Sequence, residues 1–191
     1  IKSSASSALR VWQSASLVVD KTTGRRTRVD AVFNPEHKDF EEVCSFAKQT
    51  VYAMSYTFPA VPFPYAHETI FDGLDQMEYP MMVNDNPLED RNDVITLTTH
   101  EIFHTVFPFY MGINETKYGF MDEGFATMGE WIISKIINPE YVDTYGIAPY
   151  GFQGGKEEDT PVMPLTTQSN GVPFFLNSYA DDGKDLIEAA K

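Results

Sequence analysis

The sequence predicts an α+β fold, because patterns typical of strands come early in the chain and patterns typical of helices come later. Residues 11–20 and 26–33 are rich in β-branched and apolar residues, and the turn-forming segment 22–24 separates them. Residues 93–110 and 120–137 carry apolar residues at helical spacing. The sequence thus predicts strands near the start of the chain and two helices between residues 93 and 137.

The middle of the chain alternates between the two element types. Residues 34–58 predict an amphipathic helix, because Asn34-Pro35-Glu36 resembles a helix start and apolar residues then recur every three or four positions. Residues 65–71 and 77–83 predict two further strands. Pro80 cannot donate a hydrogen bond to a neighbouring strand, so we expect 77–83 to be an edge strand that binds extended peptide along a cleft.

Composition excludes several classes of function. The net charge is −14, which argues against nucleic-acid binding, because phosphate contacts need basic patches. The sequence has no run of 18 or more apolar residues, so we expect no membrane span. The one cysteine, Cys44, excludes an internal disulfide and lies among apolar residues of the predicted helix, which favours a small buried side chain.

The chemistry is concentrated in the segment TTHEIFH and the run FMDEGFA that follows it. His100 and His104 lie four residues apart, so a helix places both imidazoles on one face, while Glu101 lies beside the first. Eighteen residues then separate His104 from Glu123, which opens a second apolar helical run. A catalytic zinc ion takes three protein ligands and keeps a fourth position for water. His100, His104 and Glu123 meet that requirement, with one zinc ion per chain.

This pattern, HEIFH with the Glu of DEGFA after 18 residues, resembles the zinc signature of the gluzincin aminopeptidases, the alanyl and leucyl aminopeptidase family. The family has NEGFA where this chain has Asp122 to Ala126, and GxMEN where this chain has Asp75 to Tyr79, so that Met77 and Glu78 match. The MEYP wording is similar to that of a bacterial side branch. The resemblance implies a thermolysin-like catalytic domain, in which a small mixed sheet packs on helices.

The resemblance also implies roles for individual residues. Glu78 would hold the free amino group of the substrate, Glu101 would act as general base, and Glu130 would support the ligand shell from two helical turns beyond Glu123. The family stabilises the oxyanion with a tyrosine downstream of the third ligand. Tyr179 lies at about the right place and is the preferred candidate, and Tyr145 and Tyr150 are the other two.

The chain is expected to be part of a longer protein, since it has no initiator Met and the family it resembles has further domains. Residues 1–33 are interpreted as a β segment that supplies the end of a preceding β domain and the first catalytic strand. Residues 34–191 are interpreted as the catalytic domain, cut short at its C-terminal end. The resemblance leans toward the periplasm or cell envelope of a bacterium as compartment.

The expected function is a zinc aminopeptidase that acts on the N-termini of peptides or proteins. Two alternatives stay open. The first is a zinc endopeptidase or a hydrolase of another amide, which would accept substrates with a blocked amino terminus. The second is a metal-binding or scaffolding relative that has lost catalysis, which the departures in MEYP and DEGFA leave open.

Overall fold

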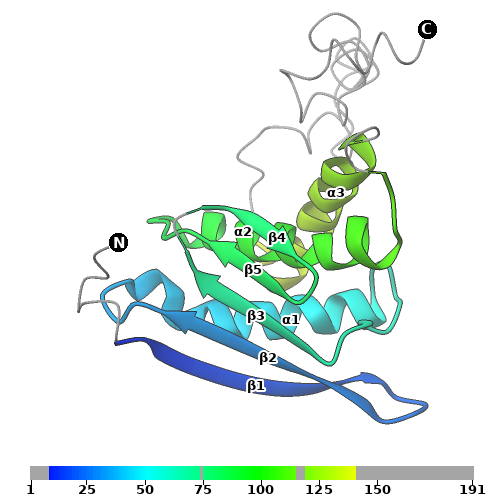
Figure 1. Cartoon of the computed structure of the whole chain (residues 1–191), viewed down its shortest axis with the longest axis horizontal. Coiled ribbons are helices and arrows are strands. Elements are labelled where there is room, and N and C mark those ends of the chain that lie inside the picture. The colour runs from blue at the N-terminus through cyan, green and yellow to red at the C-terminus, as the bar shows by residue number, and fades with distance from the viewer. Residues whose placement is uncertain (1–8, 74, 115–118, 141–191) are drawn as a thin grey trace, which may run out of the picture.

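A computed structural model describes residues 9–73, 75–114 and 119–140 of the chain. Figure 1 shows an α+β arrangement, in which one mixed five-stranded sheet of strand order β1-β2-β3-β5-β4 carries helices on one face. The predicted fold class is confirmed at this level. Helices α1 and α2 pack on the sheet, and α3 packs on α2 farther from it (Figure 1).

The first two strands form a long antiparallel hairpin, β1 (Val11–Asp20) and β2 (Arg25–Phe33). The Asp20 carboxylate closes the turn, accepting hydrogen bonds from the Thr22 amide at 2.8 Å and the Thr23 hydroxyl at 2.7 Å. Gly24 takes a positive φ of 73°, which a residue without Cβ adopts at little cost. The sequence therefore predicted both strands and the turn between them.

The sheet continues from β2 into two parallel neighbours. β3 (His67–Asp72) pairs parallel with β2, and β5 (Met82–Asp85) pairs parallel with β3. The domain boundary expected at residue 33 thus falls at the end of β2. The strands before and after this residue belong to the same hydrogen-bonded sheet. The short edge strand β4 (Met77–Tyr79) is antiparallel to β5 and completes the mixed sheet.

The prediction of a single strand over residues 77–83 is wrong. The segment is a hairpin, in which Tyr79 pairs with Met82 and Pro80-Met81 form a two-residue turn. The fixed φ of proline and its missing N–H suit a turn better than a ladder position. An edge strand was expected in this segment, and in the structure only its first part, β4, forms that edge.

Helix α1 (Val43–Tyr56) begins later than predicted, after a turn and a 3₁₀ segment, η2 (Lys38–Glu42). The buried Asp72 carboxylate explains the delay, because it accepts a hydrogen bond from the Asn34 amide at 2.8 Å and contacts His37 Nδ1 at 2.6 Å. These contacts hold residues 34–37 in a turn. Cys44 is buried, as predicted, and no disulfide partner lies within the described residues.

The core lies between the sheet and the helices. It consists mainly of aliphatic and phenylalanine side chains, among which the largest fully buried ones are Phe33, Phe40, Phe46, Phe63, Phe103, Met54, Ile70, Ile95, Ile102 and Ile133. Burial of such a side chain stabilises the fold by about 1.5–3 kcal/mol relative to its exposure. These residues fix the sheet and α2 relative to one another, and α2 carries the HExxH motif.

The two helices expected to hold the site are present. α2 (Arg91–His104) is followed by a wider π-type segment, η3 (Thr105–Tyr110), in which Phe107 departs from helical geometry at φ −120° and ψ 116°. α3 (Gly119–Ile137) matches the predicted 120–137 closely. None of the helices in the described part of the chain is long and apolar enough to cross a membrane.

Candidate metal centre

Helix α2 brings its two histidines to one point. The Asp90 side chain caps the helix by accepting hydrogen bonds from the amides of Asn92 and Asp93. Near the other end of the helix, His100 and His104 lie on the same face, and their Nε2 atoms are 3.1 Å apart. The HExxH spacing thus has the geometric consequence that the sequence predicted.

Glu123 reaches the same point from α3. Its Oε2 lies 2.9 Å from His100 Nε2 and 3.6 Å from His104 Nε2. One ligand atom of each of the three residues lies within 4.8 Å of those of the other two. Two ligands at 2.0–2.1 Å from a tetrahedral ion are about 3.3 Å apart, so these distances fit a zinc ion held by all three.

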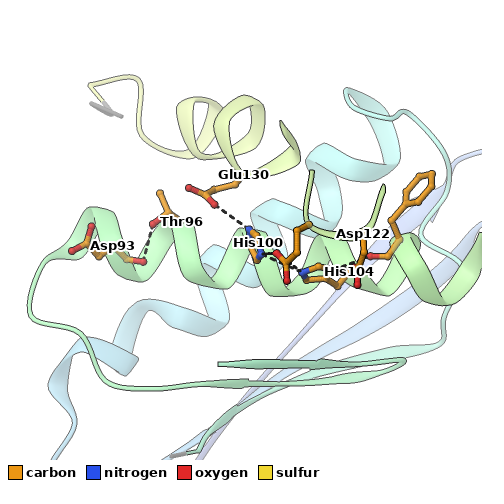
Figure 2. Close-up of polar contacts among 8 residues, drawn as sticks. Asp93, Thr96, His100, His104, Asp122 and Glu130 are labelled. Carbon is orange, nitrogen blue, oxygen red and sulfur yellow. Dashed lines mark hydrogen bonds and ion pairs between the residues drawn. The ribbon is translucent and has the colours of Figure 1, made fainter. Parts of the chain in front are cut away.

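The opposite nitrogen of each imidazole is also held. Figure 2 shows Glu130 beside His100, and Asp122 beside His104. Glu130 Oε2 is 3.1 Å from His100 Nδ1, and Asp122 Oδ1 is 2.6 Å from His104 Nδ1. The carbonyl oxygen of Phe107 lies 3.0 Å from His104 Nδ1 as well, because the chain leaves helical geometry there. Acceptors of this kind direct the Nε2 lone pairs toward a metal ion.

Asp122 is a site residue whose role the sequence analysis missed. Its position gave one signal, since it immediately precedes Glu123 in the same helical turn. The Phe107 carbonyl gave none, because a backbone atom at a helix break is not visible in a residue pattern. Glu130 was predicted to support the ligands, and the structure places it in contact with His100.

The charges of the three candidate ligands are coupled in the metal-free protein. Burial lowers the pKa of His100, but hydrogen bonds to Glu123 and Glu130 outweigh it and raise the pKa to about 9. Burial also opposes ionisation of His104, yet its contacts with Asp122 and Glu123 raise its pKa well above the usual value. The two imidazoles in turn hold the pKa of Glu123 far below its ordinary range, although burial acts in the other direction. Because a metal ion binds the neutral imidazole, metal binding to these residues should release protons.

Glu101 lies against this cluster but is not part of it. It is 5% exposed, and its Oε2 has no hydrogen-bond partner among the described residues. Burial raises its pKa to about 8, against the attraction of the two imidazoles. A buried carboxylate oxygen without a partner is costly in a folded protein unless something else contacts it. Water or substrate at the metal position would supply that contact.

Glu78 approaches the site from β4, on the other side. One ligand atom of Glu78 lies within 4.8 Å of those of Glu101 and His104. The residue is partly buried, and this burial raises its pKa while His104 acts to lower it. The structure thus brings together six of the predicted site residues, while Tyr179, Tyr145 and Tyr150 lie outside the described part of the chain.

Two further acids lie in the core near the site and were not predicted. Asp85 ends β5, is 2% exposed, and accepts a hydrogen bond from the Thr98 hydroxyl at 2.9 Å. Burial raises the pKa of Asp85 to about 7, against that hydrogen bond. Glu68 on β3 is fully buried, and neither of its carboxylate oxygens has a hydrogen-bond partner among the described residues. Burial, together with Asp85, raises the pKa of Glu68 well above its usual value.

No protein-family model matches the chain, and no curated protein matches it either. The site therefore has to be interpreted from its own geometry. Two imidazole nitrogens and one carboxylate oxygen converge, carboxylates lie behind both imidazoles, and a buried carboxylate without a partner lies beside them. This donor set suits zinc in a catalytic arrangement, with three protein ligands and an open position.

Proposed function

We propose that the chain carries the catalytic site of a zinc aminopeptidase with a thermolysin-like fold. The observation that carries the proposal is a pair of convergent groups that share His104. The first joins His104 to His100 of α2 and Glu123 of α3, and the second joins it to Glu101 and to Glu78 of the edge strand β4. The mixed sheet with helices on one face supports the fold assignment. The resemblance of HEIFH, DEGFA and MEYP to the gluzincin aminopeptidases points the same way.

Three side chains would hold the ion, namely His100, His104 and Glu123. A zinc ion there supplies Lewis-acid chemistry, because it polarises a carbonyl group and lowers the pKa of a water molecule toward about 7. Glu130 contacts Nδ1 of His100, and Asp122 contacts Nδ1 of His104. These contacts keep the Nε2 atom of each imidazole directed at the ion.

Glu101 is the general base. Its unpartnered Oε2 accepts a proton from the attacking water and returns it to the leaving amine, as a positioned carboxylate can do when its pKa lies near the working pH. A neighbouring cation favours the ionised form of Glu101, which the base needs, and so offsets the effect of burial.

Glu78 makes the site an exopeptidase site. A carboxylate whose oxygen lies within 4.8 Å of the Glu101 and His104 ligand atoms is close enough to pair with the α-ammonium group of a substrate whose first peptide bond lies at Glu101. Partial burial strengthens such a pair, because screening by water is weaker there. A substrate with an acetylated amino group loses the pair and is expected to be rejected.

The test combines metal content with two matched substrates. The zinc-loaded chain is assayed on a chromogenic aminoacyl anilide and on its N-acetyl derivative. Zinc content is measured by elemental mass spectrometry for wild type, Glu123→Ala and Glu101→Gln. We expect about one zinc ion per chain, much weakened binding in Glu123→Ala, and retained zinc in Glu101→Gln with a rate lower by about 10²–10⁴-fold.

Other outcomes decide between the alternatives. Hydrolysis of the acetylated substrate at a comparable rate would assign the chain to the endopeptidases or other amide hydrolases. Bound zinc without hydrolysis of either substrate would leave a metal-binding scaffold. Full activity in Glu101→Gln would remove Glu101 from the mechanism.

A further inference from the structure

The carboxylates around the two imidazoles outnumber what one zinc ion can balance. Five carboxyl groups either contact a histidine nitrogen or have an oxygen within 4.8 Å of one. They belong to Glu78, Glu101, Asp122, Glu123 and Glu130. A divalent ion on the histidines neutralises two negative charges, so an excess of negative charge stays in a mostly buried space, where it is costly.

The excess is concentrated on one side of the site. Asp122 and Glu130 each have a histidine nitrogen as partner, and Glu123 lies between the two imidazoles. Glu78 and Glu101 have no such partner at their carboxylate oxygens among the contacts of the described residues. They form the second convergent group of the structure, in which their ligand atoms and that of His104 lie within 4.8 Å of one another.

Glu101 shows that this second group is more than an acidic patch on the surface. It is 5% exposed, and its Oε2 is buried without a hydrogen-bond partner among the described residues. A buried carboxylate that lies within 4.8 Å of a second carboxylate is a suitable ligand for a cation. The cation removes the repulsion between the two groups and can contact the oxygen that lacks a partner.

We propose that Glu78 and Glu101 form a second, weaker cation site, which takes a divalent ion in the place of the substrate ammonium group. The proposal that this ion competes with substrate rests on the proposed aminopeptidase function, whereas the binding itself does not. His104 belongs to both convergent groups, so once it holds the first ion the second ion has two carboxylates and water as ligands. This ligand set is typical of the weak sites of Mg²⁺, Mn²⁺ and Ca²⁺.

The two sites share His104, but each also has a residue of its own that can be mutated. His100 belongs only to the first group and Glu78 only to the second. His100→Ala therefore removes the first site and keeps the second, while Glu78→Gln does the reverse and preserves the shape of the side chain. Glu89→Gln is the matched control, since Glu89 is an exposed acid outside both groups.

The experiment titrates the full chain with Mn²⁺ at physiological salt and follows free Mn²⁺ by electron paramagnetic resonance. Each protein is used both zinc-loaded and metal-free, and elemental mass spectrometry verifies that zinc is not displaced. We expect the zinc-loaded wild type and Glu89→Gln to bind one Mn²⁺ ion. Glu78→Gln should bind it at least about tenfold more weakly, because one of two charged ligands is lost.

His100→Ala separates this inference from the zinc assignment. Metal-free His100→Ala should still bind one Mn²⁺ ion, and the double variant with Glu78→Gln should not. In an active protein, Mn²⁺ should raise KM for the free-amine substrate and leave kcat unchanged. A chain that hydrolyses no peptide yet shows the Mn²⁺ pattern would refute the proposed function and keep the second site. Equal Mn²⁺ affinity of zinc-loaded wild type and zinc-loaded Glu78→Gln, or no Mn²⁺ binding by either, would overturn the second site.

Discussion

The position of α3 relative to α2 depends on one glycine. A Cβ atom at Gly129 would lie 2.3 Å from Phe103 Cδ2 and 2.6 Å from both Cε2 and Cγ of the same ring. Carbon atoms in favourable contact are about 3.5–4.0 Å apart, so Gly129→Ala requires a displacement of about 1 Å. Phe103 is 1% exposed and stacks on Phe58 with ring centroids 5.9 Å apart, so the ring has little room to move.

Two opposing effects set the magnitude. At an open helix position, Gly→Ala stabilises a protein by about 1 kcal/mol, because alanine has the higher helix propensity. Overpacking a well-filled core costs about 1–3 kcal/mol. We expect the second effect to exceed the first and Gly129→Ala to destabilise the fold by about 1–2 kcal/mol. The displacement also moves Glu123 and Glu130, the α3 residues that contact His100, so zinc affinity should fall with stability.

The assay is thermal unfolding with and without zinc, for wild type, Gly129→Ala, Phe103→Ala and the double variant. Alanine in place of Phe103 removes all the ring atoms that meet the new Cβ. The double variant should therefore lose less stability than the sum of the single variants, and the double-mutant cycle measures that coupling. A higher melting temperature for Gly129→Ala alone, or strictly additive effects, would refute the steric argument.

Three further predictions concern carboxylates. Glu130→Gln should weaken zinc binding by about 10–100-fold in a chelator competition, because His100 Nδ1 loses its charged partner. Asp122→Asn should weaken it less than Asp122→Ala in the same measurement, because an amide oxygen can keep the polar contact with His104 Nδ1 and a methyl group cannot. Glu68→Gln should become progressively more stable than wild type as the pH rises from 5 to 8 in denaturant unfolding. The folded pKa of Glu68 is raised, so its contribution is full below the unfolded value of about 4.3 and is lost as the pH rises, by about 1.4 kcal/mol for each unit of pKa shift.

The same exposed residue, Glu89, serves as control for the zinc-binding variants, since Glu89→Gln should not change zinc affinity. A stability difference between Glu68→Gln and wild type that stays constant with pH would contradict the raised pKa. Equal zinc affinity in Asp122→Asn, Asp122→Ala and wild type would show that the Phe107 carbonyl alone is enough to hold His104.

Much of the site was predictable because short-range spacing determines it. The four-residue step from His100 to His104 fixes both imidazoles on one helix face, and helical periodicity placed Glu123 and Glu130 two turns apart on a second helix. The convergence of the two helices was an inference from the need for a third ligand. It holds in the structure, where Glu123 Oε2 lies 2.9 Å from His100 Nε2.

The sequence was less informative where a contact joins distant segments. The start of α1 was misplaced because Asp72, 38 residues beyond Asn34, holds the preceding turn, and no local pattern reports such a hydrogen bond. The β4–β5 hairpin was taken as one strand, because residues 77–83 are mostly apolar and Pro80 was interpreted as the mark of an edge strand, not of a turn. Glu68 lies in a predicted strand and Asp85 in a segment predicted to be a polar loop, and neither pattern gave a reason to expect burial.

The two parts of the candidate site rest on different supports. The histidines and Glu123 belong to packed helices, whereas Glu78 lies on β4, which joins the sheet only through β5. On either side of it, Met77 and Tyr79 are 40% and 41% exposed. Mutations in the β4–β5 hairpin can therefore change the surroundings of Glu78 residue by residue without altering the α2–α3 interface. Under the proposed function, this hairpin is the place where natural selection could change which chain ends are accepted while the residues proposed to bind the ion stay unchanged.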